Sequence, residues 1–446
     1  MSGKVIFWSV TVALGGFLFG FDTAVISGAE QAIQQHWNLS EAEHGLAVAI
    51  ALYGTVLGAL FGSFPADKWG RKPALIGVGL LYLVSAVGSA LAPDVNTFML
   101  FRFLGGVGVG ASSVAAPMYI SEIAPPDKRG RLASLFQFNI VSGILIAYLS
   151  NFLLAGVGSN SWRWMLGVEA FPALLFTILM LYVPRSPRWL LSVRGDRAAA
   201  LEILSTISVE TAHEALSLME ENIEKSGRDT KLFVWRFRFP VSLAVILAVF
   251  NQISGINAII YYAPRIFQMT GLGESSALLS SAGVGLVNLI ATIIGISLID
   301  SKGRRALMII GSVGLITSLG FVSRAFFTEQ FNGVPAFVFL FIASFAVSQG
   351  CVLWVFLSEI FPNSVRAKGQ SLGSFTHWIC AALVAHFFPL AATQLGGGAV
   401  FAFFGTAMIC QLVYVLMVMP ETKGVPLEEL QRQILGEELD VKQTDP

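Results

Sequence analysis

The sequence predicts an all-α integral membrane protein with twelve transmembrane helices, and three observations support this class. The chain has 446 residues, of which 55% are hydrophobic and 13% charged, and its mean hydropathy is +0.71. Soluble globular chains carry about 25% charged residues, so this chain has too few charges to cover a surface that faces water. Apolar segments of spanning length recur along the whole chain, and the basic residues fall almost entirely on one side of them.

The apolar segments are twelve in number, and one long polar stretch, 184–238, divides six of them from the other six. The first begins with an apolar run from Val5 to Ile26 that no small-residue cleavage site follows, so we interpret it as a helix of the mature protein and not as a signal peptide. The predicted spans are 5–28, 46–64, 74–92, 97–120, 132–154, 164–183, 239–262, 277–298, 306–326, 334–357, 369–392 and 399–419.

The distribution of Lys and Arg indicates that both termini are cytoplasmic. With that orientation all but four of the 28 basic residues fall on the cytoplasmic side. The exceptions are Arg163, Arg265 and Arg324 on the outer side and Arg102 within a helix. We therefore expect a multi-pass protein of the cell membrane, which is the inner membrane in a bacterium that has two.

The two sets of six spans repeat each other. The loop after the second span, DKWGRK at 67–72, returns as DSKGRR at 300–305 after the eighth. The sequence SEIAPPDKR at 121–129 returns as SEIFPNSVR at 358–366. Repeats in the same orientation predict two halves that rock about a solute site near the middle of the membrane. The predicted domains are an N-terminal six-helix bundle, a cytoplasmic helical linker, a C-terminal six-helix bundle and a cytoplasmic tail, at 1–183, 184–238, 239–420 and 421–446.

These loops also resemble those of the sugar porter family of the major facilitator superfamily. Further similar segments are GFLFGFDTAVISG at 16–28, PRSPRWLL at 184–191, NQISGINAIIYY at 251–262 and PETKG at 420–424. The resemblance covers nearly the whole chain. It implies a monosaccharide carrier that works by alternating access and needs no cofactor.

Each half carries a Glu and an Arg seven residues apart with a Pro between them, in a loop predicted to be cytoplasmic. One interpretation is that these charges only fix the topology. The other, which the resemblance supports, is an ion-pair network that forms in one conformation and breaks in the other, and so shifts a nearly balanced equilibrium. The predicted gate residues are Arg71, Glu122, Arg129, Arg304, Glu359 and Arg366.

Three charged residues lie within predicted spans at similar depth: Asp22, Arg102 and Glu169. An unpaired charge there costs about 2.5–3.5 kcal/mol, so we expect them to be partners. A static salt bridge is one interpretation. The alternative is a proton site. Arg102 keeps Asp22 ionised when it is near, and the affinity of Asp22 for a proton rises when Arg102 moves away. The resemblance implies that Asp22 and Arg102 couple sugar to protons, with Glu169 as an auxiliary acid.

The seventh span carries the polar cluster best suited to a sugar. Asn and Gln side chains both donate and accept hydrogen bonds, as sugar hydroxyls require. Gln252 and Asn257 would point about 140° apart on an unbroken helix, so we predict a break near Gly255 that turns both inward. Single polar and aromatic residues of other spans join the site by resemblance, although each also fits a helix–helix contact. The predicted sugar-binding residues are Phe19, Gln137, Asn251, Gln252, Asn257, Tyr261, Asn288, Trp354, His377 and Trp378.

The chain departs from the family pattern at four positions. Asn251 replaces a usual glutamine and His377 a usual amide, which leaves the identity of the sugar open. Cys351 replaces a usual proline, which affects how the tenth span bends. Arg185 replaces a usual glutamate beside the predicted gate.

The predicted function is proton-coupled symport of a monosaccharide, either a hexose or a pentose, with a glucose-like sugar as the first expectation. Alternatives are a facilitative uniporter of the same fold, a non-transporting sugar sensor and an exporter of amphipathic compounds. An enzyme is not expected, because the sequence shows no catalytic or metal-binding constellation and no GxxxxGK[ST] motif. The expected partners are the sugar, the proton and the lipid bilayer, with no nucleic acid, and the protein is expected to act as a monomer.

Overall fold

The computed structural model describes residues 3–124, 129–225, 231–362 and 365–425, and every regular element in these ranges is a helix. The predicted all-α class is therefore confirmed. The elements before residue 184 are α1 (Gly3–His36), α2 (Glu41–Phe61), α3 (Ser63–Lys68), α4 (Arg71–Leu91), α5 (Val95–Ile123), α6 (Arg129–Leu154), α7 (Ser161–Gly167) and α8 (Ala170–Leu181).

The connection between the halves contains three short helices and two helical turns. They are α9 (Pro187–Trp189), the π-helical turn η2 (Leu190–Arg194), α10 (Arg197–Ile207), α11 (Ala212–Lys225) and the 3-10 turn η3 (Trp235–Phe237). Asp196 caps α10 by accepting from the Ala199 amide at 3.0 Å, and Leu204 and Leu216 are buried between α10 and α11. The segment that was predicted to be a helical linker thus contains helices.

The second half contains two membrane spans that are each divided into two helices by a break. Its elements are α12 (Arg238–Ile253), α13 (Ile256–Met269), α14 (Glu274–Lys302), α15 (Arg304–Thr328), α16 (Val334–Val347), α17 (Gln349–Glu359), α18 (Arg366–Leu395) and α19 (Gly397–Met417).

Twelve segments of the described chain are long and apolar enough to cross a membrane, in agreement with the predicted number. Eight are single helices, and four combine consecutive helices: α2 with α3, α7 with α8, α12 with α13, and α16 with α17. The breaks matter because a broken membrane helix places polar backbone and side chains inside the bundle.

The first helix is longer than its predicted range of 5–28. α1 continues to His36, because its last turns carry polar residues that are buried against other helices. Glu30 is fully buried, and the Gln34 amide donates to Glu41 on α2 at 3.0 Å. Hydropathy ends a span where polar residues begin, whereas the helix continues as long as those residues find partners.

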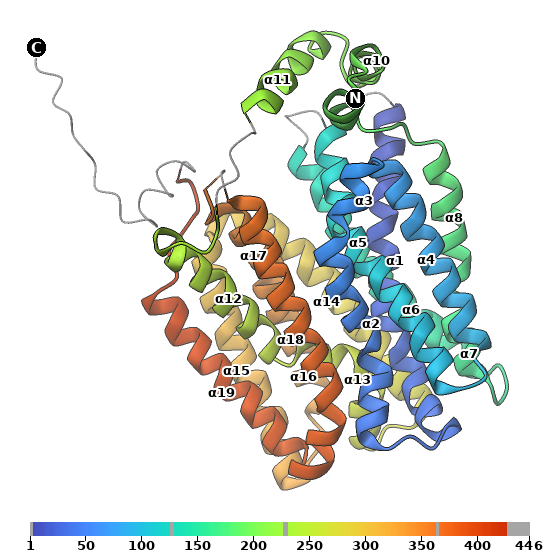
Figure 1. Ribbon diagram of the computed structural model, residues 1–446. Helices are drawn as coiled ribbons and strands as arrows, with labels where there is room; N and C mark the ends of the chain where they lie inside the picture. The colour runs from blue at the N-terminus through green and yellow to red at the C-terminus, as the bar shows by residue number, and fades with distance from the viewer. Residues whose placement is uncertain (1–2, 125–128, 226–230, 363–364, 426–446) are drawn as a thin grey trace, which may run out of the picture.

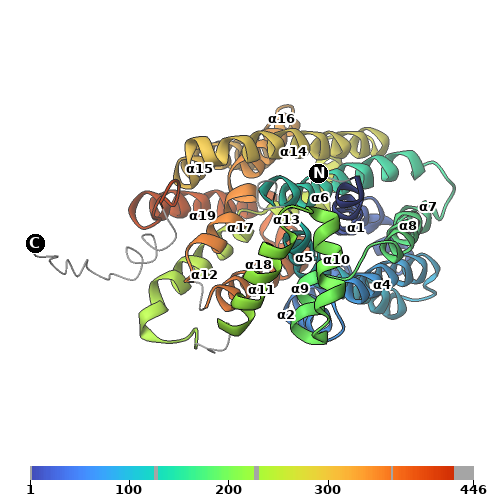
Figure 2. The same ribbon diagram turned by 90° about the horizontal axis from the view of Figure 1, so that it is seen from above.

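The spans form two bundles side by side (Figure 1). α10 and α11 lie beyond one end of the bundles, here named the linker end, and the loop between α1 and α2 lies at the opposite end, here named the far end (Figure 1). The view from above shows α15 and α19 on the left and α1, α4 and α8 on the right (Figure 2). The halves meet where α2 packs on α18, α6 on α14 and α1 on α13.

Glycine permits the closest of these helix contacts. A Cβ at Gly20 on α1 would lie 1.8 Å from the Ile140 carbonyl oxygen on α6, within the first half. A Cβ at Gly45 on α2 would lie 2.0 Å from the His386 carbonyl oxygen on α18, across the two halves. In a membrane such small residues allow backbones to approach and pack by van der Waals contact.

Candidate functional site

The predicted break in the seventh span is confirmed. α12 ends at Ile253 and α13 begins at Ile256, with Gly255 between them at φ +87°. L-residues rarely adopt this conformation, and a Cβ at Gly255 would also lie 2.4 Å from the Phe404 ring. Glycine at this position therefore allows the chain to turn.

The break brings the three amides of the seventh span together. The Asn257 amide donates to Gln252 Oε1 at 2.6 Å, and Gln252 Nε2 donates to Asn251 Oδ1 at 2.8 Å. Asn251 Nδ2 donates in turn to the Gln349 carbonyl oxygen on α17 at 3.3 Å. All four residues are at most 7% exposed. Buried amides are costly when unpaired, so this network holds a polar centre inside an apolar bundle.

Aromatic rings lie beside this amide network. Gln252 Nε2 is 3.2 Å from each ring nitrogen of His377, whose ring centroid is 4.9 Å from that of Trp354 and 4.8 Å from that of Trp378. Trp378 also contacts Phe19 of α1, at 5.4 Å between centroids, so this contact joins the two halves. Within the described residues the buried Trp378 Nε1 donates to no acceptor. A ring wall with a free donor suits a sugar, which presents both C–H faces and hydroxyls.

A second break lies in the tenth span, next to the same network. Ser348 separates α16 from α17 with φ −108° and ψ −92°. Since Cys351 stands where proline is usual, its backbone N–H is available and donates to the Ser348 carbonyl at 3.2 Å. Gln349 was not among the predicted site residues, yet it is buried, its carbonyl accepts from Asn251, and its Oε1 has no donor within the described part of the chain. The signal was the polar pair 348–349 within an apolar span.

The structure does not join Gln137 and Asn288 to the amide network. Gln137 is half-buried on α6. Asn288 on α14 is 9% exposed and accepts a long contact of 3.5 Å from Thr292. Their assignment to a sugar site remains a prediction.

The charged residues within the spans do meet. Arg102 Nη1 of α5 lies 2.5 Å from Asp22 Oδ1 of α1, and its Nη2 donates to the Asp22 carbonyl oxygen at 3.1 Å. Asp22, Arg102 and Glu169 are each 1% exposed. Glu169 interacts electrostatically with both members of the pair, and its Oε1 has no hydrogen-bond donor among the described residues. The cluster thus consists of two carboxylic acids and one guanidinium that are buried away from water.

Tyr261 connects this charged cluster with the amide network. It lies one turn beyond Asn257 on α13, is fully buried, and interacts electrostatically with Asp22 and Arg102. Its hydroxyl hydrogen-bonds Thr23, the residue after Asp22. Tyr261 is therefore a residue of α13 that lies beside the charged cluster of α1 and α5.

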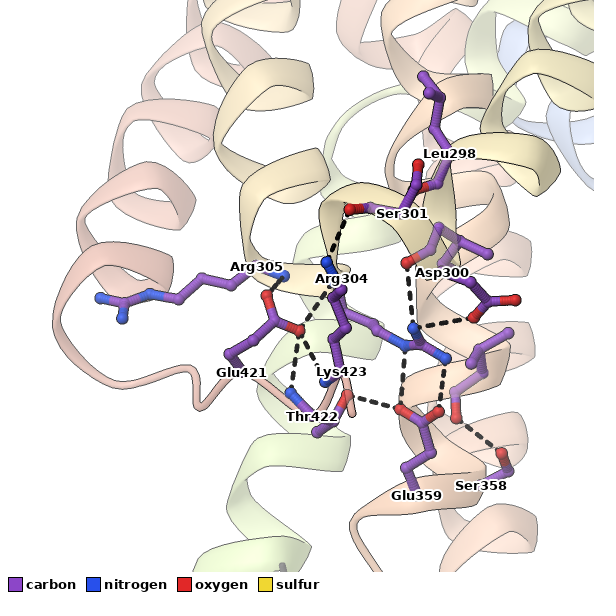
Figure 3. Close-up of polar contacts among 12 residues, drawn as sticks. Leu298, Asp300, Ser301, Arg304, Arg305, Ser358, Glu359, Glu421, Thr422 and Lys423 are labelled. Atoms are coloured by element: carbon purple, nitrogen blue, oxygen red, sulfur yellow. Dashed lines mark hydrogen bonds and ion pairs between the residues drawn. The ribbon is translucent and has the colours of Figure 1, made fainter. Parts of the chain in front are cut away.

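At the linker end of the second half, Arg304 holds Glu359 with two hydrogen bonds, at 2.7 Å from Nη2 and 3.2 Å from Nε (Figure 3). Thr422 Oγ1 donates to the same carboxylate at 2.5 Å, and Asp300 pairs with Arg304 at 3.1 Å. Two of the predicted gate residues are therefore partners, within one half.

Glu421 belongs to the same cluster and binds the N-terminus of α15. Its carboxylate accepts from the backbone N–H groups of Arg304 at 2.9 Å and Arg305 at 3.0 Å, which open α15 (Figure 3). An anion at a helix N-terminus is stabilised by these free amides and by the helix dipole. Burial raises the pKa of Glu421, but the backbone amides of Lys423, Arg304, Arg305 and Thr422 together lower it by more, so that the pKa lies below its usual value.

The first half repeats this arrangement with one exception. Arg71 pairs with Glu122 at 2.9 Å and with Asp67 at 3.1 Å. Arg185 stands where the second half has Glu421, and a guanidinium has no acceptor for the amides that open α4. Its guanidinium lies instead over the ring of Trp189, at 5.2 Å.

The two remaining gate predictions are not placed in these pairs. The side chain of Arg129 lies outside the described part of the structure. Arg366 Nε donates to the Phe361 carbonyl at 3.2 Å, within the same loop and helix. Their role in a gate stays a prediction.

At the far end the halves are joined by polar contacts. Tyr53 on α2 and His386 on α18 hydrogen-bond at 2.9 Å between the hydroxyl and Nδ1. The Tyr148 hydroxyl on α6 donates to the Ile260 carbonyl on α13 at 2.7 Å. The ion pairs Arg71–Glu122 and Arg304–Glu359 at the linker end, by contrast, each join residues of the same half. An ion pair and an amide network inside a bundle of two rocking halves are features of secondary transporters.

Comparison with known proteins agrees with this class. A family model described as "Sugar (and other) transporter" matches residues 8–434. The chain is 37% identical over 441 residues to the arabinose-proton symporter of Bacillus subtilis (strain 168), covering 96% of this chain and 95% of that protein. It is 36% identical over 464 residues to the D-xylose-proton symporter of Escherichia coli (strain K12), covering 95% and 94%.

Among solved structures, the chain resembles the partially occluded inward open conformation of the xylose transporter XylE from E. coli. The TM-score is 0.86 at 33% sequence identity, and the match covers 95% of this chain and 100% of that one. The protein belongs to the sugar transporter family of the major facilitator superfamily and is a multi-pass membrane protein.

Proposed function

We propose that the protein is a symporter that carries one monosaccharide together with a proton by alternating access. The observation that supports this most strongly is the Asp22–Arg102 pair, which is fully buried and connected to the amide network through Tyr261. A buried acid with a mobile counter-ion can hold a proton in one state and release it in another. The relatives named as arabinose-proton and xylose-proton symporters support the same assignment.

The proposed orientation places the linker end in the cytoplasm, with both termini, because 24 of the 28 basic residues then lie inside. The proposed moving parts are the bundles 1–183 and 239–420, connected by 184–238 and followed by the tail 421–446. We propose that one chain is the working unit, because the two halves supply both sides of the site.

The proposed sugar site has Gln252 and Asn257 at its centre, because the break at Gly255 brings both to one place and the rings of Trp378 and His377 border it. Asn251 and Gln349 hold Gln252 in position. Sugar hydroxyls would replace some of the hydrogen bonds that these amides now make to one another, and Trp378 Nε1 offers a donor that is not yet used. The aromatic residues Phe19 and Trp354, with Tyr261, complete the walls, and Gln137 and Asn288 are proposed contacts from α6 and α14.

Coupling follows from the charges. While Arg102 is bonded to Asp22 the ionised carboxylate is stabilised, and a proton is released. In the other state Asp22 moves away from the guanidinium, and the acid, now desolvated without a partner, takes up a proton. Sugar bound against α13 reaches this pair through Tyr261. Glu169, beside the pair, is proposed as an auxiliary acid that keeps Arg102 neutralised.

The proposed cytoplasmic gate is built from the two pairs Arg71–Glu122 and Arg304–Glu359. Each holds the loops of its own half in a fixed shape, and we propose that these shaped surfaces meet when the protein faces outward. Arg129 and Arg366 are the proposed cations that reach the other half in that state.

An uptake measurement in proteoliposomes tests the function. Labelled pentoses and hexoses are offered with and without an inward proton gradient. We expect one sugar to accumulate above its external concentration only with the gradient, and an uncoupler to abolish the accumulation. Uptake that equilibrates but never accumulates would instead identify a uniporter, and sugar binding without uptake would identify a sensor.

A further inference from the structure

One arginine joins the halves at the far end. Arg265 of α13 binds Glu30 of α1 with two hydrogen bonds, 3.1 Å from Nε to Oε1 and 3.0 Å from Nη2 to Oε2. It also contacts Gln34 at 2.5 Å and Glu41 of α2 at 3.8 Å. Glu30 is fully buried, whereas the Arg265 side chain is 25% exposed. The buried carboxylate of one half therefore has its counter-ion in the other half.

Glu30 also has a second partner, in its own half. His44 Nε2 of α2 lies 2.8 Å from Glu30 Oε2, and both side chains are fully buried. Both ring nitrogens of His44 are buried, and neither makes a hydrogen bond within the described residues. The edge of the imidazole faces Tyr262 of α13, at 5.9 Å between centroids. His44 therefore faces the Glu30 carboxylate as a potential ion-pair partner that is not yet hydrogen-bonded to it.

The charged and titratable groups around His44 come from four elements. They are Glu30 on α1, Glu41 on its own helix α2, Arg265 and Tyr262 on α13, and His386 on α18. In the present conformation Arg265 already serves as the counter-ion of Glu30. If α13 moved away with the second half, Arg265 would leave and Glu30 and His44 would remain together.

A buried carboxylate that loses its arginine needs another cation, because an uncompensated buried charge is strongly destabilising. We propose that Glu30 exchanges counter-ions when the far end opens, from Arg265 in the closed state to a protonated His44 in the open state. His44 takes up one proton from the outer solution, and the imidazolium then pairs with Glu30 through Nε2, which lies 2.8 Å from Oε2. The proton returns to the solution when Arg265 returns. This inference rests on the proposed alternating access.

The exchange makes the far end a second proton-dependent element, distinct from Asp22. Acid outside would favour the open outer gate, which is the state in which sugar and the coupling proton enter. The exchange neither forms nor breaks a covalent bond apart from the added N–H of the His44 ring.

Distance measurements between spin labels at the far end test it. Gln35 at the end of α1 and Ser275 at the start of α14 are both exposed and belong to different halves. The native cysteines of the full chain are replaced, and new cysteines at these two positions carry the labels. The distance between the labels then reports the opening of the far end. The background carries Asp22→Asn, so that the coupling acid does not titrate. Gly45→Ala serves as an opened control because its Cβ would collide with α18, and Gly77→Ala, which meets nothing within 4 Å, as a neutral one.

We expect the ratio of the open population to the closed population, read from the distance distribution, to rise about tenfold as the pH falls from about 8 to about 5.5. This is the range in which histidine titrates. His44→Gln, whose amide can donate to Glu30 but cannot take up a proton, should abolish this rise. Arg265→Gln should raise the open fraction at about pH 8 and flatten the pH response, and Arg265→Lys should restore part of it.

Two results would overturn the exchange: a pH response that persists in His44→Gln, or an Arg265→Gln variant with the same closed fraction as its parent at high pH. The failure of alternating access has a different signature. In that case added sugar and Gly45→Ala would both leave the distances unchanged, whatever the pH, and the exchange would fall together with the proposed function.

Discussion

Replacing Gln252 by alanine tests the sugar site most specifically. The substitution removes the acceptor of the 2.6 Å bond from Asn257 and the donor of the 2.8 Å bond to Asn251. Each lost buried hydrogen bond to the sugar, or to the amides that hold it, costs about 1–3 kcal/mol. One such bond lowers sugar affinity by about fivefold to about a hundredfold.

Gln411→Ala is the matched control for this substitution. Gln411 is a buried amide of the same half, and its Nε2 donates to Ser312 at 2.9 Å, away from the proposed site. Both variants lose a buried amide and should lose similar thermal stability, but only Gln252→Ala should lose affinity. Binding is measured by tryptophan fluorescence or calorimetry on the purified protein. An affinity within about twofold of wild type in Gln252→Ala would place the sugar elsewhere.

Three further predictions concern the linker end. Glu122→Gln or Glu359→Gln should shift the population away from the outward-facing state, as cysteine labelling of the two vestibules would show, and an unchanged pattern in both would leave these charges as topology signals only. Glu421→Gln should lower stability by about 1 kcal/mol near neutral pH. Because the pKa of Glu421 lies below its usual value, its contribution is present above the unfolded pKa and is lost as the pH falls through the folded one. Thermal unfolding should therefore distinguish the variant from wild type near neutral pH and not in strong acid. Arg185→Glu should supply the first half with the acid that Glu421 supplies to the second and raise the melting temperature by a few degrees, whereas a lower melting temperature would show that its contact with the Trp189 ring matters more.

Periodicity and charge predicted the arrangement of the chain because both follow from local sequence. A span must be apolar over its length, and the basic loops must stay on one side of the membrane. The number of spans could therefore be predicted without knowing any tertiary contact. The break near Gly255 was also predictable, since polar residues on opposite sides of a helix need a turn to meet, and glycine permits it.

Contacts between distant residues were harder to predict. Gln349 lies near Asn251 only because two broken helices cross, and Glu421 meets α15 only through the packing of α19 on it. Hydropathy gave no sign that Glu30, His44 and Arg265 are partners. The signal was Arg265 itself, a basic residue on the side of the membrane that basic residues avoid. Such an exception calls for an acid within reach, and α1 supplies it.

Proton movement driven by sugar tests the central claim most directly. Proteoliposomes containing a pH-sensitive dye inside are given the transported sugar without any imposed gradient. Wild-type protein should acidify the interior as the sugar enters. Asp22→Asn keeps the size and much of the hydrogen bonding to Arg102 but removes the acid, so it should bind and exchange sugar without acidifying the interior. Wild-type protein that takes up sugar with no change of internal pH, or an Asp22→Asn variant that still concentrates sugar, would contradict the account.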